Sequence, residues 1–214
     1  MWSAKTPEII KPLAGDMVWE IHPVTNEVFL TFDDGPTPGV TDRVLDILSA
    51  HDARATFFCL GKNAEAQNEL FNRIIADGHS VGNHTVNHVN GWKTNNSAYF
   101  REYLVGARQT DQRLFRPPYG RITRHQASQI AARAHVVMWD VLSGDFDPKT
   151  TPDSCAKHVI DNTKPGSIIV MHDSRKAADT MLKALPVILQ SLQNAGYLLV
   201  GLTNKYLPQK KRAR

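Results

Sequence analysis

The chain has 214 residues, of which 42% are hydrophobic and 21% are charged, and its formal net charge is +4 at pH 7. This length and composition predict one ordinary soluble globular domain and exclude an intrinsically disordered chain. Lys210, Lys211, Arg212 and Arg214 alone carry four positive charges, so residues 1–209 have no net charge. The absence of net positive charge in residues 1–209 argues against a dedicated nucleic-acid-binding protein.

The sequence offers no sign of a membrane span or an export signal. No stretch approaches the ~18–20 uninterrupted apolar residues that cross a bilayer. Residues 1–7 contain no apolar core followed by a small-residue cleavage site. We therefore expect no membrane span and a cytoplasmic location, with export by another route as the alternative. Cys59 and Cys155 are far apart and form no CxxC pair, which predicts two buried free thiols.

Short runs of β-branched or aromatic residues alternate with longer stretches of helical pattern. The short runs predict strands at residues 28–32, 55–60, 80–83, 114–116, 136–139, 167–171 and 197–201. The stretches between them predict helices at residues 41–51, 64–77, 98–113, 123–133, 154–162 and 176–195. Gly78, Gly166 and Gly196 stand directly before strands, where a helix must end and turn.

This alternation predicts an α/β fold in which helices cover a parallel sheet. About seven strands can form either an open doubly wound sheet or a barrel related to the (β/α)8 type, and composition does not decide between them. No internal repeat or linker is visible, so we expect a single domain over residues 28–204. We expect residues 1–27 to be an N-terminal extension and residues 205–214 a basic tail, both on the surface.

Polar residues that a core would not select follow the predicted strands. They are Asp33, Asp34, His84, His88, Arg116, Pro117, Pro118, Tyr119, Asp140, Asp145, His172 and Asp173. In a parallel α/β architecture these points emerge on one face, at the carboxyl ends of the strands, where such folds place their ligand sites. The sequence therefore predicts one functional site on that face.

A histidine pair and an acidic pair together predict a metal site. His84 and His88 are spaced i, i+4, which presents two imidazoles to one point if the segment forms a helical turn. Asp33 and Asp34 follow a strand, where adjacent side chains point in opposite directions, so one can bind the metal while the other faces the substrate. Two imidazoles and one carboxylate form a common zinc site with an open position for water. An Asp-Gly turn and histidines in structural packing are the alternatives.

His172 follows the apolar run at residues 168–171, which is typical of a buried strand. A histidine titrates near neutral pH, so His172 is the natural proton donor of such a site. A histidine that only caps the core is the alternative.

Five segments in chain order resemble the signature motifs of the polysaccharide deacetylases, the NodB-homology domain of carbohydrate esterase family 4. They are TFDDGP at residues 31–36, HTVNH at 84–88, RPPYG at 116–120, SGDF at 143–146 and VMHD at 170–173. The resemblance implies a distorted (β/α)7-type barrel related to the TIM barrel. It also implies a hydrolase that removes N-acetyl groups from amino-sugar polymers or oligomers. One divalent metal, usually zinc, with cobalt or nickel as alternatives, would be held by Asp34, His84 and His88.

The resemblance further implies a role for each remaining motif residue. Asp33 would be the general base, and Arg116 would hold it in place. His172 would be the general acid, and Asp145 would orient it and support its protonated form. The backbone N–H of Tyr119 would help to bind the oxyanion.

The chain departs from the family pattern at two positions. Phe146 stands where the fourth motif commonly has Trp, and Val170 stands where the fifth motif commonly has Leu. Both would line the acetyl pocket, so the chemistry is expected to survive, while the pocket size and sugar preference stay open. Pro117 and Tyr119 would also bind the substrate. Trp92, in a predicted loop after the histidine pair, could stack on a sugar ring or pack into the core.

Other functions stay open at this point. The same metal chemistry could serve a hydrolase of a sugar O-acetyl ester or of a small cyclic amide. A non-catalytic carbohydrate-binding protein is less favoured because Asp33 and His172, the base and acid positions, are both present. We expect an N-acetylated carbohydrate as partner and no nucleic acid, while the natural polymer, the metal and the oligomeric state are not readable.

Overall fold

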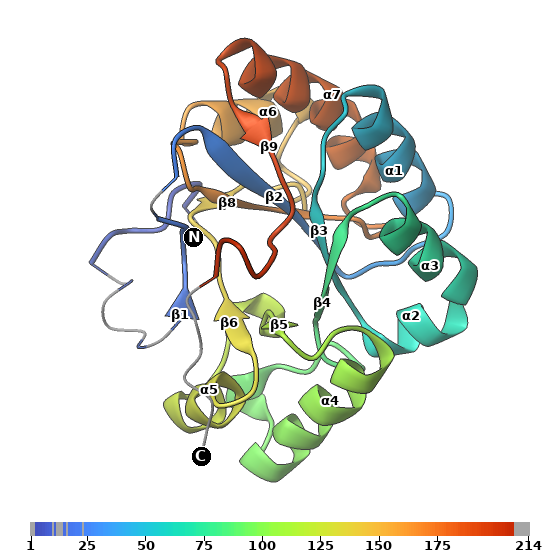
Figure 1. The fold of residues 1–214 in the computed structure, drawn as a ribbon, viewed down its shortest axis with the longest axis vertical. Helices are drawn as coiled ribbons and strands as arrows, with labels where there is room; N and C mark the ends of the chain where they lie inside the picture. The colour runs from blue at the N-terminus through green and yellow to red at the C-terminus, as the bar shows by residue number, and fades with distance from the viewer. Residues whose placement is uncertain (1–2, 10, 12–14, 16, 23, 208–214) are drawn as a thin grey trace.

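The computed structural model describes residues 3–9, 11, 15, 17–22 and 24–207 (Figure 1). The strands are β1 (Met17–Val18), β2 (Glu27–Asp33), β3 (Thr56–Cys59), β4 (Ser80–Asn83), β5 (Leu114–Phe115), β6 (His135–Val137), β7 (Val141–Leu142), β8 (Ile168–His172) and β9 (Leu198–Leu199). The α-helices are α1 (Thr41–Ala50), α2 (Gly61–Ala66), α3 (Asn68–Ala76), α4 (Asn96–Gln109), α5 (Arg124–Ala131), α6 (Pro152–Ile160) and α7 (Ala178–Asn194). Two short 3₁₀ turns, η2 (Gly91–Lys93) and η3 (Pro118–Gly120), precede α4 and α5.

The strands form one curled parallel sheet with the helices on its outer side (Figure 1). Its order is β1-β6-β5-β4-β3-β2-β8-β7, and β9 pairs with the start of β2. The stretch from β6 to β7 is nearly continuous in the chain, yet β6 pairs with β5 and β7 pairs with β8. The chain therefore passes directly from β6, next to one end of the sheet order, to β7 at the other end. This closure confirms the distorted (β/α)7-type barrel and rules out the open doubly wound sheet.

The N-terminal segment fills the seam of this barrel. Met17 and Val18 of β1 pair with β6. Glu20 forms an antiparallel bridge with Ser167, which precedes β8, and Ile21 is buried. The described part of this segment therefore belongs to the barrel wall, contrary to the expected surface extension, because the seam offers it unpaired backbone groups on two strands. Of the expected basic tail, residues 208–214 lie outside the described residues.

The alternation of side chains along β2 shows how the barrel separates an outer core from its interior. Leu30 and Phe32 pack outward against helices α1, α3, α6 and α7. Phe29 points inward and packs with Leu202 and Leu207 of the C-terminal segment. Because side chains alternate with a period of two, Thr31 and Asp33 share the inward face with Phe29. The polar inward residues thus lie toward the carboxyl end of β2.

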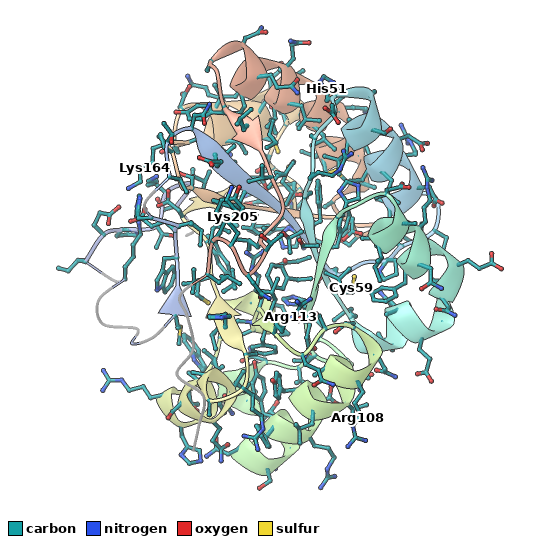
Figure 2. The ribbon with its side chains drawn as sticks, in the orientation of Figure 1. His51, Cys59, Arg108, Arg113, Lys164 and Lys205 are labelled. Atoms are coloured by element: carbon teal, nitrogen blue, oxygen red, sulfur yellow. The ribbon has the colours of Figure 1, made fainter. Side chains whose placement is uncertain are left out.

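Both cysteines are free and buried, as predicted. Cys59 lies inside the molecule, whereas Arg108 on α4 lies at its periphery (Figure 2). The helix predicted at residues 64–77 is instead two helices, α2 and α3, because Gln67 between them has the non-helical angles φ −120° and ψ 48°. Among the described residues, no helix is long and apolar enough to cross a bilayer.

Candidate functional site

The carboxyl ends of the strands bring most of the predicted polar residues together. Asp33 ends β2, His172 ends β8, and the two are register partners in adjacent strands. His84 follows the last residue of β4. Asp140 does not belong to this group, because the chain continues in the same direction through β7 before it reaches the carboxyl end. The Asp140 amide donates to Ile168 O at the start of β8.

Asp140 instead belongs to an ion cluster with the N-terminal segment. Its carboxylate pairs with Lys5 and Lys11 and accepts a hydrogen bond from Ser167. Lys11 also pairs with Glu20. The cluster ties the segment to the barrel wall. It lies near the start of β8, whereas the site lies at the end of that strand.

Three side chains form a candidate metal centre. Asp34 Oδ1 lies 3.1 Å from His88 Nε2 and 3.7 Å from His84 Nε2. All three ligand atoms lie within 4.8 Å of one another. A tetrahedral ion with bonds of about 2.0–2.2 Å separates its ligands by about 3.3–3.6 Å, so these positions fit a divalent metal. Asp34 Oδ1 is buried with no aligned hydrogen-bond donor, as expected for an atom that binds a cation.

The protonation states of these residues suit metal binding. His84 Nδ1 donates to Arg116 O at 2.8 Å, which leaves the Nε2 lone pair facing Asp34. Burial lowers the pKa of His84 to about 4, so its ring is neutral at pH 7. Burial would raise the pKa of Asp34, but the neighbouring His88, His172 and His84 together hold it well below its usual range. The site therefore combines a carboxylate with a neutral imidazole before any cation arrives.

The loops that carry these residues adopt left-handed backbone conformations. The segment from His84 to His88 is not the expected helical turn: Thr85 has φ 65° and His88 has φ 59°. Thr85 Oγ1 accepts the His88 N–H and stabilises this loop. Asp34 has φ 84°, so the chain leaves the extended form there. As a result Asp33 Oδ2 and Asp34 Oδ1 do not diverge as expected, and both lie within 4 Å of His84 Nε2.

Asp33 is held by a fully buried arginine. Arg116 Nη1 donates to Asp33 Oδ1 at 2.8 Å and to Thr31 Oγ1 at 2.6 Å. Arg116 Nη2 donates to Met138 O, and Nε donates to Val137 O. The guanidinium is thus fixed by side chains of β2 and by backbone carbonyls at the end of β6. It leaves Asp33 Oδ2 free to face the candidate metal centre.

In the sheet order, Arg116 follows β5 and His172 ends β8, and the strands that carry the candidate metal centre lie between them. Its Nδ1 is 2.8 Å from Asp145 Oδ1, and the Phe146 ring packs edge-on against it at 5.4 Å. Burial alone would lower the pKa of His172, but the Asp145 ion pair, with Asp34 and Asp33 nearby, raises it to about 9. His172 is therefore a cationic acid at neutral pH.

The turn at η3 presents both an aromatic ring and a backbone amide. Pro117 and Pro118 have no N–H, Gly120 N–H donates to Pro117 O, and Arg121 N–H donates to Pro118 O. The remaining backbone N–H of this turn belongs to Tyr119, whose φ is 60°. Its ring is exposed and lies 4.4 Å from the His88 ring. The turn can therefore approach a ligand bound at the candidate metal centre.

Two supporting contacts of this geometry were not indicated by the sequence, one made by Asp173, which was expected on this face, and one made by Asn63, which was not. Asp173 is buried and accepts hydrogen bonds from Gly35 N and Thr41 Oγ1, and burial raises the pKa of its carboxyl to about 7. Asn63 Nδ2 donates to Asp34 O. Both contacts hold the loop that carries Asp34. The TFDDGP and VMHD motifs contained Gly35 and Asp173, but no local pattern indicates that they touch.

Trp139 is a further neighbour that the sequence did not indicate. A Cβ built on Gly120 would lie 2.6 Å from the Trp139 ring, so the indole lies directly beneath the η3 turn. Val170 shares the inward face of β8 with His172, since the two are two residues apart. Phe146 and Val170 thus supply apolar surface next to the acid, and Trp139 supplies it beneath the η3 turn.

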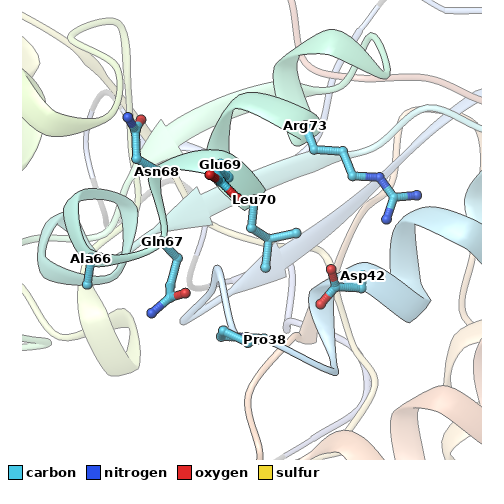
Figure 3. Close-up of a pocket in the computed structure, with 8 residues that line it drawn as sticks. All are labelled: Pro38, Asp42, Ala66, Gln67, Asn68, Glu69, Leu70 and Arg73. Carbon is cyan, nitrogen blue, oxygen red and sulfur yellow. The ribbon is translucent and has the colours of Figure 1, made fainter.

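One surface pocket lies apart from these residues. It lies beside α1, α2 and α3 and is lined by Pro38, Asp42, Ala66, Gln67, Asn68, Glu69, Leu70 and Arg73 (Figure 3). None of these residues belongs to the site. Arg73 is already paired with Asp46.

Comparisons with known proteins place the chain among deacetylases. Residues 22–139 match the family described as polysaccharide deacetylase. The chain is 34% identical over 195 residues to a peptidoglycan-N-acetylglucosamine deacetylase of Bacillus cereus, covering 87% of this chain and 70% of that protein. It is 32% identical over 192 residues to a chitooligosaccharide deacetylase of Bradyrhizobium sp., covering 81% and 87%.

A solved structure shares this fold over most of the chain. It is a peptidoglycan N-acetylglucosamine deacetylase in complex with 4-naphthalen-1-yl-N-oxidanyl-benzamide. It superposes with a TM-score of 0.84 at 31% identity and covers 91% of this chain and 94% of that one.

Proposed function

The chain belongs to the polysaccharide deacetylase family, whose members are hydrolases of carbon–nitrogen bonds, and we propose that it removes N-acetyl groups as acetate from N-acetylglucosamine polymers or oligomers. The observation that carries this proposal is the pair of groups around the candidate metal centre. Asp33 is held by Arg116, and His172 is held in its charged form by Asp145. A base and an acid that differ in protonation at one pH are what amide hydrolysis requires.

Asp34, His84 and His88 would hold one divalent metal, which we propose is zinc, with cobalt or nickel able to replace it. Bound there, the metal would supply Lewis-acid polarisation of the acetamide carbonyl and a lowered pKa for water.

The proposed proton transfers use Asp33 and His172. Asp33 Oδ2 accepts a proton from the attacking water while Arg116 holds the other oxygen. The tetrahedral oxyanion receives a hydrogen bond from the Tyr119 N–H, which is fixed before the substrate arrives. His172 then donates its proton to the amine nitrogen as the C–N bond breaks, which yields acetate and a free amino sugar. Phe146, Val170 and Pro117 would contact the acetyl methyl group.

The pKa of His172 favours an amide over an ester. An amine is a poor leaving group and needs a proton before the bond breaks, whereas an alcohol leaves more readily. A histidine whose pKa is raised to about 9 keeps that proton throughout the neutral range. This supports N-deacetylation over the alternative of O-acetyl ester hydrolysis.

The test is acetate release from N-acetylglucosamine oligomers by the purified protein, after chelation and after zinc or cobalt is added back. We expect release that depends on the added metal and that is lost in the Asp33→Asn variant. If the metal-loaded protein releases acetate from an O-acetylated sugar and none from the oligomers, the esterase is correct instead. Absence of both activities with metal bound would contradict catalysis altogether.

A further inference from the structure

Three exposed side chains form a ledge beside the candidate metal centre. They are Trp92 of η2, Tyr119 of η3 and Arg121. Trp92 is 65% exposed and Tyr119 is 59% exposed. Arg121 Cζ lies 5.3 Å from the Trp92 ring centroid and 6.0 Å from that of Tyr119. Because the Tyr119 ring also packs on His88, the ledge is continuous with the candidate metal centre.

The ledge is rigid although its surface is open. Trp92 Nε1 donates to Ile122 O at 3.2 Å, and Gly91 N–H donates to Arg121 O at 3.1 Å. The buried Gln126 donates to Gly91 O and Thr94 O. The indole is thus fixed along its N–H edge while most of its surface stays in solvent. An aromatic ring held in this way is preorganised to stack on a sugar, since little conformational entropy is lost on binding.

The charge of the ledge is positive. Residues 89–101 and 112–139, which include both of its segments, contain no Asp or Glu. Within residues 24–207, no carboxylate pairs with the Arg121 side chain, which instead contacts the two aromatic rings. A guanidinium presents several N–H donors in a fork that matches a carboxylate. The ledge therefore combines a stacking surface with an unneutralised anion-binding group.

We infer that Trp92 and Arg121 form a sugar subsite that selects amino-sugar chains carrying a carboxylate, on a sugar next to the one that loses its acetyl group. Trp92 stacks on the neighbouring ring, and Arg121 binds the carboxylate attached to it. This inference rests on the proposed function and specifies its substrate class as an acidic glycan.

The test compares two tetrasaccharides of equal length. One is neutral N-acetylglucosamine tetramer, and the other alternates N-acetylglucosamine with N-acetylmuramic acid, whose lactyl carboxylate is free when no peptide is attached. We expect the zinc-loaded protein to show a KM about tenfold lower for the acidic chain, which corresponds to about 1.4 kcal/mol. Arg121→Gln should raise the KM for the acidic chain about tenfold, leave its kcat unchanged and leave the neutral chain unaffected.

Two further variants separate the contributions. Trp92→Ala should raise the KM for both chains, because stacking does not depend on charge. Arg108→Gln removes the same charge from the periphery of α4 and should change neither (Figure 2). An equal effect of Arg121→Gln on both chains, or no effect on either, would overturn the inference.

A binding experiment keeps this result independent of turnover. Calorimetry gives the affinity of each tetrasaccharide for two proteins, the Asp33→Asn variant and the double variant that also carries Arg121→Gln. These affinities report on the subsite alone. Preference for the acidic chain that depends on Arg121 supports the subsite even if no acetate is released. Acetate release from both chains without such a preference contradicts the subsite and leaves the proposed function intact.

Discussion

Asp145 holds His172 with both of its carboxylate oxygens. Oδ1 lies 2.8 Å from the ring Nδ1, and Oδ2 accepts the backbone N–H of His172 at 2.7 Å. One carboxylate therefore fixes the ring orientation and favours the charged imidazolium. This leaves Nε2 as the nitrogen that can donate a proton to a substrate.

The alkaline limit of activity should move when the negative charge of Asp145 is removed. His172 is active in its protonated form, so activity is lost as pH rises through its pKa, and a pKa raised to about 9 extends activity to alkaline pH. Asp145→Asn removes the charge that raises this pKa, so the alkaline limb of the kcat profile should move to lower pH by at least about one unit. The pH–rate profiles of both proteins measure this. An unchanged alkaline limb would argue that His172 is not the acid.

Asp33→Asn should abolish turnover and leave the metal bound. The amide cannot accept the proton, and general-base catalysis contributes about 10²–10⁴-fold. Zinc content and kcat of the same preparation measure both effects, with Asp34→Asn as the matched variant that should lose metal. Metal loss in Asp33→Asn with retention in Asp34→Asn would show that the roles of the two residues are exchanged.

His84→Ala and His88→Ala should each weaken zinc affinity by at least about 100-fold, because each removes one of three ligands from a site whose supporting contacts alone are worth 10–100-fold. Calorimetric titration of the metal-free proteins gives the affinities. His125→Ala, an exposed histidine on α5, is the control and should bind zinc like the original chain. Normal affinity in both ligand variants would remove the proposed metal centre.

Arg116→Met should destabilise the protein by about 3–5 kcal/mol, since it leaves the buried Asp33 charge without its partner. Urea unfolding measures this change in the free energy of unfolding. Arg113→Met breaks an exposed ion pair with Asp111 and should change stability by less than about 1 kcal/mol. Similar losses in the two variants would mean that Arg116 contributes no more than a surface charge.

Several features of the fold could be predicted locally. The inward and outward alternation of Phe29 and Leu30 and the apolar stripe of α1 depend on backbone periods of 2 and 3.6 residues, which any segment reveals by itself. Because parallel strands all end on one face, the position of Asp33, His84 and His172 at strand ends was enough to predict that they share a site.

Tertiary structure decided how these residues meet. The left-handed backbone at Asp34, Thr85 and His88 helps to bring the side chains of Asp34, His84 and His88 to one point, and none of the residues with that backbone adopts it as readily as glycine. β1 pairs with a strand more than a hundred residues away, so no local pattern reveals that it closes the seam. Asp140 was misplaced for the same reason, since only the pairing of β7 with β8 shows that the chain has not yet reached the carboxyl face.

The sequence by itself therefore determined which residues are the candidates for the chemistry and on which face of the barrel they emerge. Their distances, their protonation and the exposure of Trp92 were decided only by the folded chain. The physical reason is range: periodicity and strand direction are set by neighbours in the sequence, whereas the contacts of Arg116 with Asp33 and of Asp145 with His172 join segments brought together by the barrel.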